Sequence, residues 1–515
     1  MAEWLLFFFF LLILPFVLIF HFTKIRTQRN LRNPPGPPGL PFIGNLHQFD
    51  SLKPHIVLRN LSNKYGPLMS LRLGSRPMVV ISSAKIAKEC LKTHDLVFSG
   101  RPPLVSYQKY SNNGLDVAFS PYGEYWREMR KVAVLHLLSV KRVESFRPIL
   151  EDEISSLIDK ISNLSCSCQP INLSSLMINL TSSLICRIGF GKKYGEEDHE
   201  KKRFDRVLHE SQALFAGFFV SDYLPLLSWV DKISGMLDRL EKNSKDLDLF
   251  YQELIDEHLN PNRPDTMKDD ILDILIQIKH EQSSSSNVFT WDHIKAMLMN
   301  VFIAGTDTSS ALITWAMTAM MQTPSAMKKV QSEIRDLVGK NGIITDEILQ
   351  QLPYLDAVIK ETFRLYPPVP VLLPRETIQD CDIEGYFVKS KTMIIINAWA
   401  IARDPECWKN PEDFAPERFL NSSVDVKGND FQLIPFGAGR RGCPGISLAM
   451  STFSTSIAKI ALAYFLYSFD WELPTGMKIE DIDVDTARGV AFSTVTMHKK
   501  NPLCLMAKRY TIGQE

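Results

Sequence analysis

The chain has 515 residues, and its 58 basic and 58 acidic side chains leave no net charge. A neutral chain lacks the basic field that attracts nucleic acid, so this class of partner is not expected. A hydrophobic fraction of 45% is enough for a large core. Eight cysteines are too sparse for a disulfide scaffold, and only Cys166 and Cys168 are close neighbours, with no second pair at zinc-site spacing.

The N-terminus begins with an uninterrupted apolar run. Residues 4–20 read WLLFFFFLLILPFVLIF, near the short limit of about 17 to 25 residues for a spanning helix. Basic residues follow this run from Lys24 to Arg32, whereas only Glu3 precedes it, and this asymmetry places the rest of the chain in the cytosol. A cleaved secretory signal is the alternative, but it needs a basic start and a small-x-small cleavage site, and both are missing. We therefore predict a retained membrane anchor over residues 1–23.

A proline-rich segment separates this anchor from the rest. Residues 33–41 read NPPGPPGLP, and prolines fix φ and lack a backbone donor, so no helix continues through them. We predict a basic, proline-rich linker over residues 24–41 that acts as a stiff spacer. Residues 42–515 then form the globular body.

The body is predicted to be mainly helical with small β-sheets. Strand-like runs are few and short, at residues 68–73, 77–82 and 392–398. Residues 260–270 and the serine run 283–286 are typical of surface loops.

The longest helical pattern starts after Thr290, a predicted N-cap, and stops at Thr323, before Pro324. It is apolar nearly all round beyond Lys295, which indicates a helix through the middle of a large core. A second membrane span is the alternative. Its polar residues Asn300, Thr306, Asp307 and Thr308 would be costly in lipid, so we favour the core helix.

The stretch FGAGRRGCPG, residues 436–445, contains a G-x-G-x-x-G pattern typical of dinucleotide-binding loops. FQLIP (431–435) before it fits a short strand, and a helix is predicted after it. However, only about 70 residues follow Gly442, too few for the remaining strand–helix units of such a fold. We therefore reject the dinucleotide interpretation.

Cys443 in the same stretch is the alternative centre of chemistry. A thiolate ligand requires a lowered pKa. Arg440 and Arg441 are expected to supply positive charge, and Pro444 to open a helix whose N-terminus adds to it. Glycines let the backbone pass close beneath a flat macrocycle, and Phe436 is expected to cover the sulfur.

Together these residues resemble the haem-binding signature of the cytochrome P-450 family: Phe436-x-x-Gly439-x-Arg441-x-Cys443-x-Gly445. Four further motifs resemble the family's in the expected order. They are WREMR (126–130), AGTDT (304–308), ETFR (361–364) and PERF (416–419). The hydrophobic anchor and PPGPPG segment resemble those of microsomal members. In detail the chain is similar to plant A-type enzymes of specialised metabolism, and to a subgroup that includes aldoxime-metabolising enzymes.

The resemblance implies a cytochrome P-450 fold with haem b between a long central helix and a C-terminal cysteine loop. Cys443 is the implied metal ligand. The implied cofactor-binding residues are Trp126, Arg130, Ala304, Arg375, Phe436, Arg441, Cys443 and Gly445.

The implied catalytic pair is Thr308, which binds the oxygen on the iron, and Asp307, which relays protons from solvent. Ala304 and Gly305 are expected to leave room for dioxygen. Glu361 and Arg364, three residues apart on one helix face, form with Arg418 an implied buried ion-pair network that supports the cysteine loop.

Electrons must come from outside, because the sequence shows no flavin or nicotinamide site. NADPH and flavins are thus involved only indirectly, through a membrane-bound NADPH–cytochrome P-450 reductase. Arg127, Lys131 and Arg440 are expected to form part of its basic docking face. The implied location is the endoplasmic reticulum membrane, single-pass, with the catalytic domain cytosolic.

The predicted activity is monooxygenation of a small apolar or aromatic substrate. The alternatives are a haem-thiolate isomerase or dehydratase working without O2, and a membrane-held haem-binding protein. Such isomerases tend to lose the acid–threonine pair, whereas this chain keeps Asp307 and Thr308. By family position the substrate contacts are expected from 103–115, Phe215, Phe218, Phe219, Asn300, Ile303, 369–373 and 489–493.

Overall fold

The computed structural model describes residues 32–48, 53–167, 169–195, 198–282, 289–446, 457–486 and 495–511. The predicted anchor and the first part of the linker lie outside these ranges, as do the serine run and residues 489–493. Within the linker, the carbonyls of Pro34 and Pro35 accept hydrogen bonds from Ser70, at 2.7 Å each. This part of the proline-rich segment therefore lies against the globular body.

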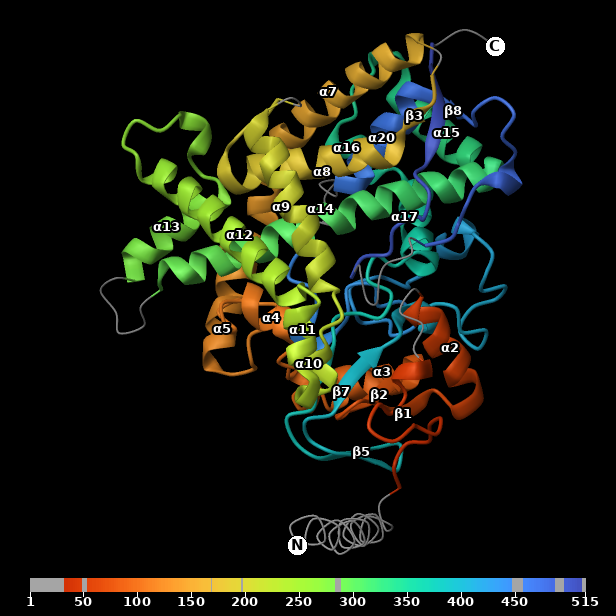
Figure 1. The fold of residues 1–515 in the computed structure, drawn as a ribbon. Helices are drawn as coiled ribbons and strands as arrows, with labels where there is room; N and C mark the ends of the chain where they lie inside the picture. Colours follow the sequence, from red (N-terminus) through yellow and green to blue (C-terminus); the bar gives the residue numbers. More distant parts are fainter. Residues whose placement is uncertain are drawn as a thin grey trace, which may run out of the picture.

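A small sheet occupies the lower half of the molecule (Figure 1). Its order is β1 (Leu68–Leu73), β2 (Arg76–Ile81), β7 (Met393–Ile396) and β4 (Arg375–Glu376). β1 and β2 form an antiparallel hairpin, while β7 runs parallel to β2 with Met78 opposite Met393. The three strand-like runs of the sequence are confirmed, since β-branched and apolar side chains of these strands are buried.

Two smaller sheets complete the β-structure of the described residues. β3 (Ile171–Asn172), β9 (Cys504–Arg509) and β8 (Phe469–Glu472) form one, and β5 (Cys381–Ile383) and β6 (Tyr386–Val388) form the other.

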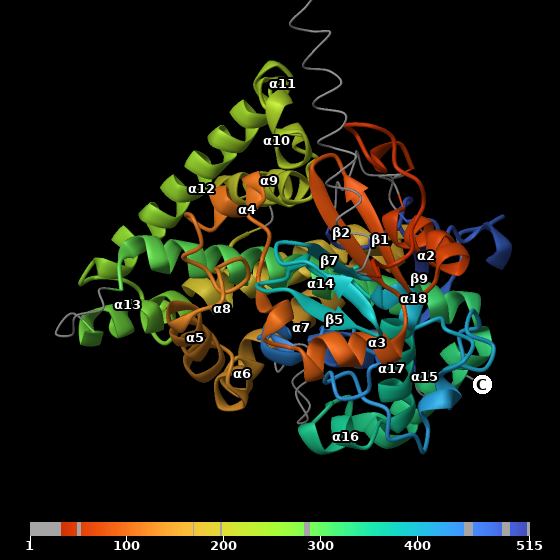
Figure 2. The ribbon, with the colours of Figure 1, turned by 90° about the horizontal axis from the view of Figure 1, so that it is seen from below.

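Helices make up most of the remainder. α14 (Trp291–Gln322) crosses the centre, packed against α8 (Leu173–Phe190), α17 (Pro353–Leu365) and α20 (Ile457–Ser468) (Figures 1 and 2). The others are α2 (Pro54–Tyr65), α3 (Ala84–Lys88), α4 (Val105–Tyr110), α5 (Glu124–Lys131), α6 (Val140–Ser145), α7 (Arg147–Cys166), α9 (His199–Phe215), α10 (Val220–Tyr223), α11 (Trp229–Ile233), α12 (Met236–Leu259), α13 (Ile271–Gln282), α15 (Pro324–Val338), α16 (Asp346–Gln350) and α18 (Ala398–Ile401).

The central helix begins and ends where its sequence predicts. Thr290 caps it in a reciprocal box with His293, and Pro324 starts the next helix. By length and composition α8 and α14 could each cross a membrane. Their mutual packing in the core supports the core-helix interpretation of α14. Phe302 of α14 stacks on Phe190 of α8, with ring centres 4.2 Å apart, and both side chains are fully buried.

One local prediction is wrong. Residues 431–435 form turns and irregular backbone rather than a strand. The amide of Leu433 bonds back to Asp430 and that of Gly437 to Ile434, so these groups serve turns instead of a ladder. The dinucleotide interpretation therefore lacks the strand that it requires before the glycine pattern, in addition to the strand–helix units that it requires after it.

Candidate active site

The cysteine loop is closed by its own backbone. The amide of Cys443 donates to the carbonyl of Phe436 at 2.9 Å, and Gly442 donates to Gly439 at 2.9 Å. Gly439 has φ +70°, and a Cβ there would lie 2.3 Å from the carbonyl oxygen of Leu91. This position therefore requires glycine for both conformation and space. Residues 447–456, the first half of the helix predicted after Pro444, are outside the described ranges, and the second half of that prediction is the helix α20.

The charges around Cys443 differ from the expectation. Burial raises the pKa of its thiol, while the Gly445 amide and the Arg130 guanidinium act to lower it. Arg440 instead faces Asp95 and Tyr122, and Arg441 donates to backbone carbonyls. The sulfur thus has its cation from α5 rather than from its neighbours in the loop. Phe436 packs on Phe363, with ring centres 5.0 Å apart.

Four arginines lie close together at this loop, and one of them, Arg441, belongs to it. Arg130, Arg375 and Arg441 were predicted from the sequence, and Arg101 was not. Burial, with a smaller contribution from mutual repulsion, lowers the pKa of Arg441 to about 8, of Arg375 to about 9 and of Arg101 to about 10. Burial also lowers the pKa of Arg130. The predicted Trp126 lies among them, with the Arg441 guanidinium 4.4 Å from its ring centre.

This cluster has little negative charge to balance it. Asp95 approaches Arg375 only to 3.8 Å and also faces Arg440, and Asp116 acts on Arg101 and Arg441 at longer range. Burial raises the pKa of Asp116, which weakens its contribution. Two further carboxylates would balance the site, and the two carboxylates of haem are such groups. The residues present therefore fit the cofactor.

The sequence alone could not identify Arg101 as a member of this arginine cluster. It precedes Pro102 in an irregular segment, with no neighbouring motif to single it out. Its guanidinium donates to the carbonyls of Ala118, Leu373 and Pro374 at 2.7 to 3.0 Å. It thereby joins its own segment and that of Ala118 to Leu373, which lies 272 positions after Arg101 in the chain.

The middle of α14 carries the predicted catalytic pair. The Thr308 hydroxyl donates to the carbonyl of Ala304 at 2.6 Å, and Ala304 is exposed although the helix crosses the core. This face of α14 therefore has room beside it. Asp307 makes an ion pair with His498, Oδ1 to Nε2 2.7 Å.

Gly305 does not contribute to that room. A Cβ on it would lie 2.7 Å from Cδ1 of Ile185 on α8. The lack of a side chain serves close packing of α14 on α8, which corrects the expectation that Gly305 leaves space for dioxygen.

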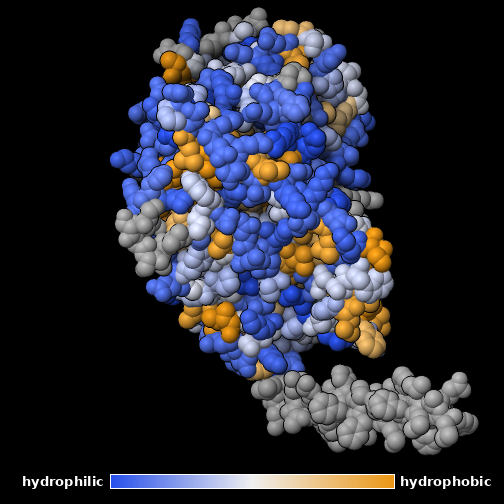
Figure 3. Space-filling view, turned by 60° about the vertical axis from the view of Figure 1, so that its left-hand side comes forward, coloured by the Kyte–Doolittle hydropathy of each residue, from blue (hydrophilic) through white to orange (hydrophobic). Residues whose placement is uncertain are grey.

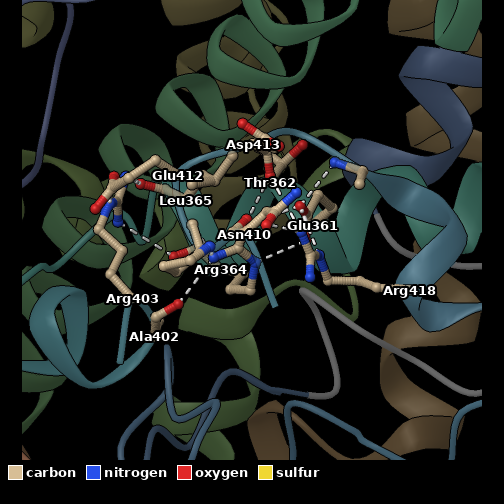
Figure 4. Close-up of polar contacts among 12 residues, drawn as sticks. Glu361, Thr362, Arg364, Leu365, Ala402, Arg403, Asn410, Glu412, Asp413 and Arg418 are labelled. Carbon is tan, nitrogen blue, oxygen red and sulfur yellow. Dashed lines mark hydrogen bonds and ion pairs between the residues drawn. The ribbon is translucent and has the colours of Figure 1, made fainter. Parts of the chain in front are cut away.

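The buried ion-pair network is formed as the resemblance implies (Figure 4). Arg364 donates from Nε and Nη2 to both oxygens of Glu361 at 2.8 Å, and both side chains are fully buried. Arg418 adds a bond to Glu361 at 3.0 Å. The remaining Arg364 donors bind the carbonyls of Ala402, Pro411 and Asp413. The network thus ties α17 to the segment that leads to the cysteine loop.

A cavity of about 130 Å³ lies beside the Asp307–His498 pair, since His498 lines it. Several predicted substrate contacts line it too: Leu104, Ser106, Tyr107, Phe215, Val371, Leu372 and Leu373. Phe218 and Phe219 do not line it: Phe218 stacks on Tyr223, and Phe219 is completely buried. His55 and Leu58 of α2 also line the cavity, and no feature of their sequence distinguishes them from an ordinary amphipathic helix.

Asn300 is occupied by the segment between α4 and α5, residues 111–123, here named the α4–α5 loop. Its Oδ1 accepts from the amides of Val117 and Ala118, and its Nδ2 donates to Asp116 at 2.8 Å. Asp116 in turn accepts from two further amides of the loop. Asn300 therefore holds this loop on α14.

The predicted basic face lies partly on α5. Arg127 is exposed there, and Lys131 pairs with Glu128 three residues earlier at 2.7 Å. The side chain of Arg440 is half exposed and forms an ion pair with Asp95, Nε to Oδ2 3.4 Å.

Comparison with known proteins agrees with this geometry. The family model for cytochrome P450 matches residues 34–503. The 6,7,8-trihydroxycoumarin synthase of Pastinaca sativa is 48% identical over 93% of this chain and 94% of that protein. The strychnine-11-hydroxylase of Strychnos nux-vomica is 45% identical over 94% of this chain and 93% of that protein. A zebrafish cytochrome P450 solved with progesterone superposes with a TM-score of 0.72 at 26% identity, covering 88% of this chain and 99% of that chain.

These findings favour monooxygenation over the isomerase and haem-carrier alternatives. The family and fold imply haem held by a cysteine thiolate, with electrons supplied by a reductase. The plant relatives are named synthases and hydroxylases. The chain belongs to the cytochrome P450 family and is a haem-thiolate monooxygenase.

Proposed function

We propose that this enzyme hydroxylates a planar, oxygenated aromatic metabolite of the coumarin type. The observation that carries the proposal is the aromatic wall of the cavity. Tyr107 stacks on Phe119 with ring centres 4.1 Å apart, and Phe119 on Phe215 at 5.4 Å. Tyr107 and Phe215 face the cavity together with Leu373. Flat apolar rings favour a flat apolar ligand with few polar groups. One relative is named as a synthase of a trihydroxycoumarin and another as a hydroxylase of strychnine.

Cys443 is the proposed iron ligand, with Phe436 and Gly445 beside the sulfur. Arg130, Arg375, Arg441 and Arg101, with Trp126, are proposed to hold the haem carboxylates; their surplus positive charge supports this role. Ala304 gives the macrocycle room against α14.

When bound, haem supplies the activation of O2, one atom of which enters the substrate while the other leaves as water. Thr308 is proposed to orient hydrogen bonds at the reacting oxygen from its place on α14, and Asp307 to deliver protons to it. The hydrogen bond from Thr308 to Ala304 at 2.6 Å fixes the hydroxyl on the face of α14 that has room beside it.

We propose that the enzyme is anchored in the endoplasmic reticulum membrane by residues 1–23, with the catalytic body cytosolic and a membrane-bound NADPH–P450 reductase as electron donor. Exposed apolar side chains support contact with a membrane at the lower end of the molecule: Phe42 (85% exposed), Leu226 (93%), Trp229 (57%) and Ile233 (78%). Gly74 and Ser75 at the β1–β2 turn bond to the carbonyls of Ile43 and Tyr223, which brings the two segments together. Figure 3 shows apolar groups at this end amid polar surface.

The test is reconstitution of the full chain with reductase in vesicles and a panel of coumarins. We expect a substrate-dependent spectral change and a hydroxylated product that requires NADPH and O2. Phe215→Ala should weaken binding at least tenfold, whereas Phe218→Ala, outside the cavity wall, should leave it unchanged. If no coumarin or related planar aromatic binds, the substrate proposal is wrong. If product forms without O2, the monooxygenase role is wrong.

A further inference from the structure

Asp307 does not stand alone in the middle of α14. Its Oδ1 is 2.7 Å from Nε2 of His498, a residue 191 positions later in the chain. We propose that His498 is the positioning residue that holds the proton for Asp307 and passes protons from solvent to it. This inference rests on the proposed role of Asp307 and extends it to a second residue.

The backbone next to the histidine is held in place by two hydrogen bonds. In the preceding residue, Met497, the amide donates to the carbonyl of Pro368 at 2.7 Å, and the carbonyl accepts from Nε1 of Trp315 at 2.7 Å. Trp315 belongs to α14 and is fully buried. The segment that carries His498 is therefore fixed to the same helix as Asp307, and the pair does not depend on a long flexible side chain.

The electrostatics of the pair favour an imidazolium beside a carboxylate. Burial alone would raise the pKa of Asp307, but the His498 charge and hydrogen bond bring it below its usual value. Burial would lower the pKa of His498, but Asp307 raises it above the ordinary 6.5. The hydroxyl of Thr496 also bonds Asp307, and His209 on α9 adds a weaker field. Lys499 faces Asp483 and the ring of Trp315 instead.

The exposed fractions of the two side chains indicate the direction of proton transfer. The His498 side chain is 24% exposed and that of Asp307 is 13% exposed. His498 also lines the cavity, together with Thr496. The histidine is thus the more accessible member of the pair, on the side of the cavity, and we place it upstream of the carboxylate.

The transfer balances simply. The His498 imidazolium gives its Nε2 proton to Asp307 Oδ1, which leaves a neutral imidazole and a neutral carboxyl. The imidazole then takes a proton from water, and Asp307 passes its own proton toward the site. Each O2 consumed requires two protons, so the pair must cycle twice per turnover. An imidazole suits this task because it both holds and releases a proton near neutral pH.

The first test does not depend on turnover. Deuterium exchange at the ring C2 position, followed by mass spectrometry across pH, reports the pKa of each histidine in the full-length protein. We expect His498 to titrate above the ordinary histidine value, and at least one unit lower in Asp307→Asn. Equal values in the two proteins would overturn the pairing.

The second test uses coupling of NADPH consumption to product between pH 6 and 8. His498→Gln keeps a side-chain donor toward Asp307 but cannot titrate, and we expect product per NADPH to fall at least fivefold with a flattened pH profile. His498→Lys keeps the cation and should still lower coupling, because lysine does not release its proton readily in this range. His209→Gln is the matched control and should behave as wild type.

The outcomes separate the two levels of inference. Wild-type coupling in both His498 variants, with Asp307→Asn impaired, would reject the role of His498 and leave that of Asp307. Wild-type coupling in Asp307→Asn would reject the proposed proton relay itself. Wild-type coupling in His498→Lys alone would mean that only the positive charge matters, which also contradicts proton transfer through His498. If His498→Gln fails to bind haem, the lysine variant and the exchange measurement still decide the question.

Discussion

Replacing Glu361 by glutamine removes one charge from the centre of the Arg364 network while keeping the size of the side chain. Glu361 and Arg364 are both fully buried, and Arg418 is 13% exposed. The substitution leaves two guanidinium groups facing a neutral amide, and the amide NH2 faces one of them as a second donor. Removing one partner of a buried ion pair costs about 3–5 kcal/mol. The second arginine places the expected loss in the upper part of that range.

The chain offers a matched control on its surface. Arg203 and Glu253 form a bond pattern of the same kind, with Nη1 and Nη2 on the two carboxylate oxygens at 2.7 and 3.1 Å. These side chains are 32% and 53% exposed. Glu253→Gln is therefore expected to cost only about 0.2–1 kcal/mol.

Urea unfolding of the full-length protein, followed by circular dichroism and by haem absorbance, measures both losses. Because the network supports the cysteine loop, haem release should precede global unfolding in Glu361→Gln and coincide with it in Glu253→Gln. Equal losses in the two variants, or an unchanged haem transition in Glu361→Gln, would refute the structural role of the buried network.

Three further substitutions test other parts of the site. Cys443→Ser should abolish the red-shifted absorbance band of the reduced carbon monoxide complex, and Cys407→Ser should retain it; a retained band in the first would reject Cys443 as ligand. Gly439→Ala should prevent haem loading, because its Cβ would meet the Leu91 carbonyl at 2.3 Å, whereas Gly195→Ala, with open space around it, should load normally. Burial raises the pKa of Asp222 from 3.8 to about 6, so the folded state holds this proton more tightly and loses stability as pH rises from about 4 to 6. Asp222→Asn should then raise the unfolding free energy by up to about 3 kcal/mol at pH 7.5 and by little at pH 4; an equal gain at both pH values would contradict this.

Sequence patterns predicted correctly those parts of the fold that depend on interactions between neighbouring residues. The N-cap at Thr290 and the stop before Pro324 bound α14 correctly, because a helix end is set by residues within one turn. The three strand-like runs are strands because their apolar residues also find pairing partners in one sheet. FQLIP was the exception: its composition fits a strand, but within the described residues no strand pairs with it, and pairing decides whether a strand forms.

Contacts between distant segments could not be predicted from spacing. The cation beside Cys443 is Arg130, more than 300 residues earlier, while the adjacent Arg440 and Arg441 point elsewhere. The turn at Gly439 redirects the chain, so sequence neighbours of the cysteine do not share its surroundings. The partner of Asp307 was missed likewise, since nothing local in MHKKNPL connects its histidine with α14.

The α4–α5 loop is held largely through hydrogen bonds to its main chain, and Asp116 is the loop side chain that takes part. Arg101, Arg441 and Trp126 bind its carbonyls, while Asn300 and Asp116 bind its amides. A backbone bond is indifferent to the side chain of the residue that makes it. Most side chains of the loop, Asp116 excepted, can therefore change over evolutionary time without loss of these bonds. The loop is thus suited to diversification, because substitutions in it need not disturb the scaffold that holds it.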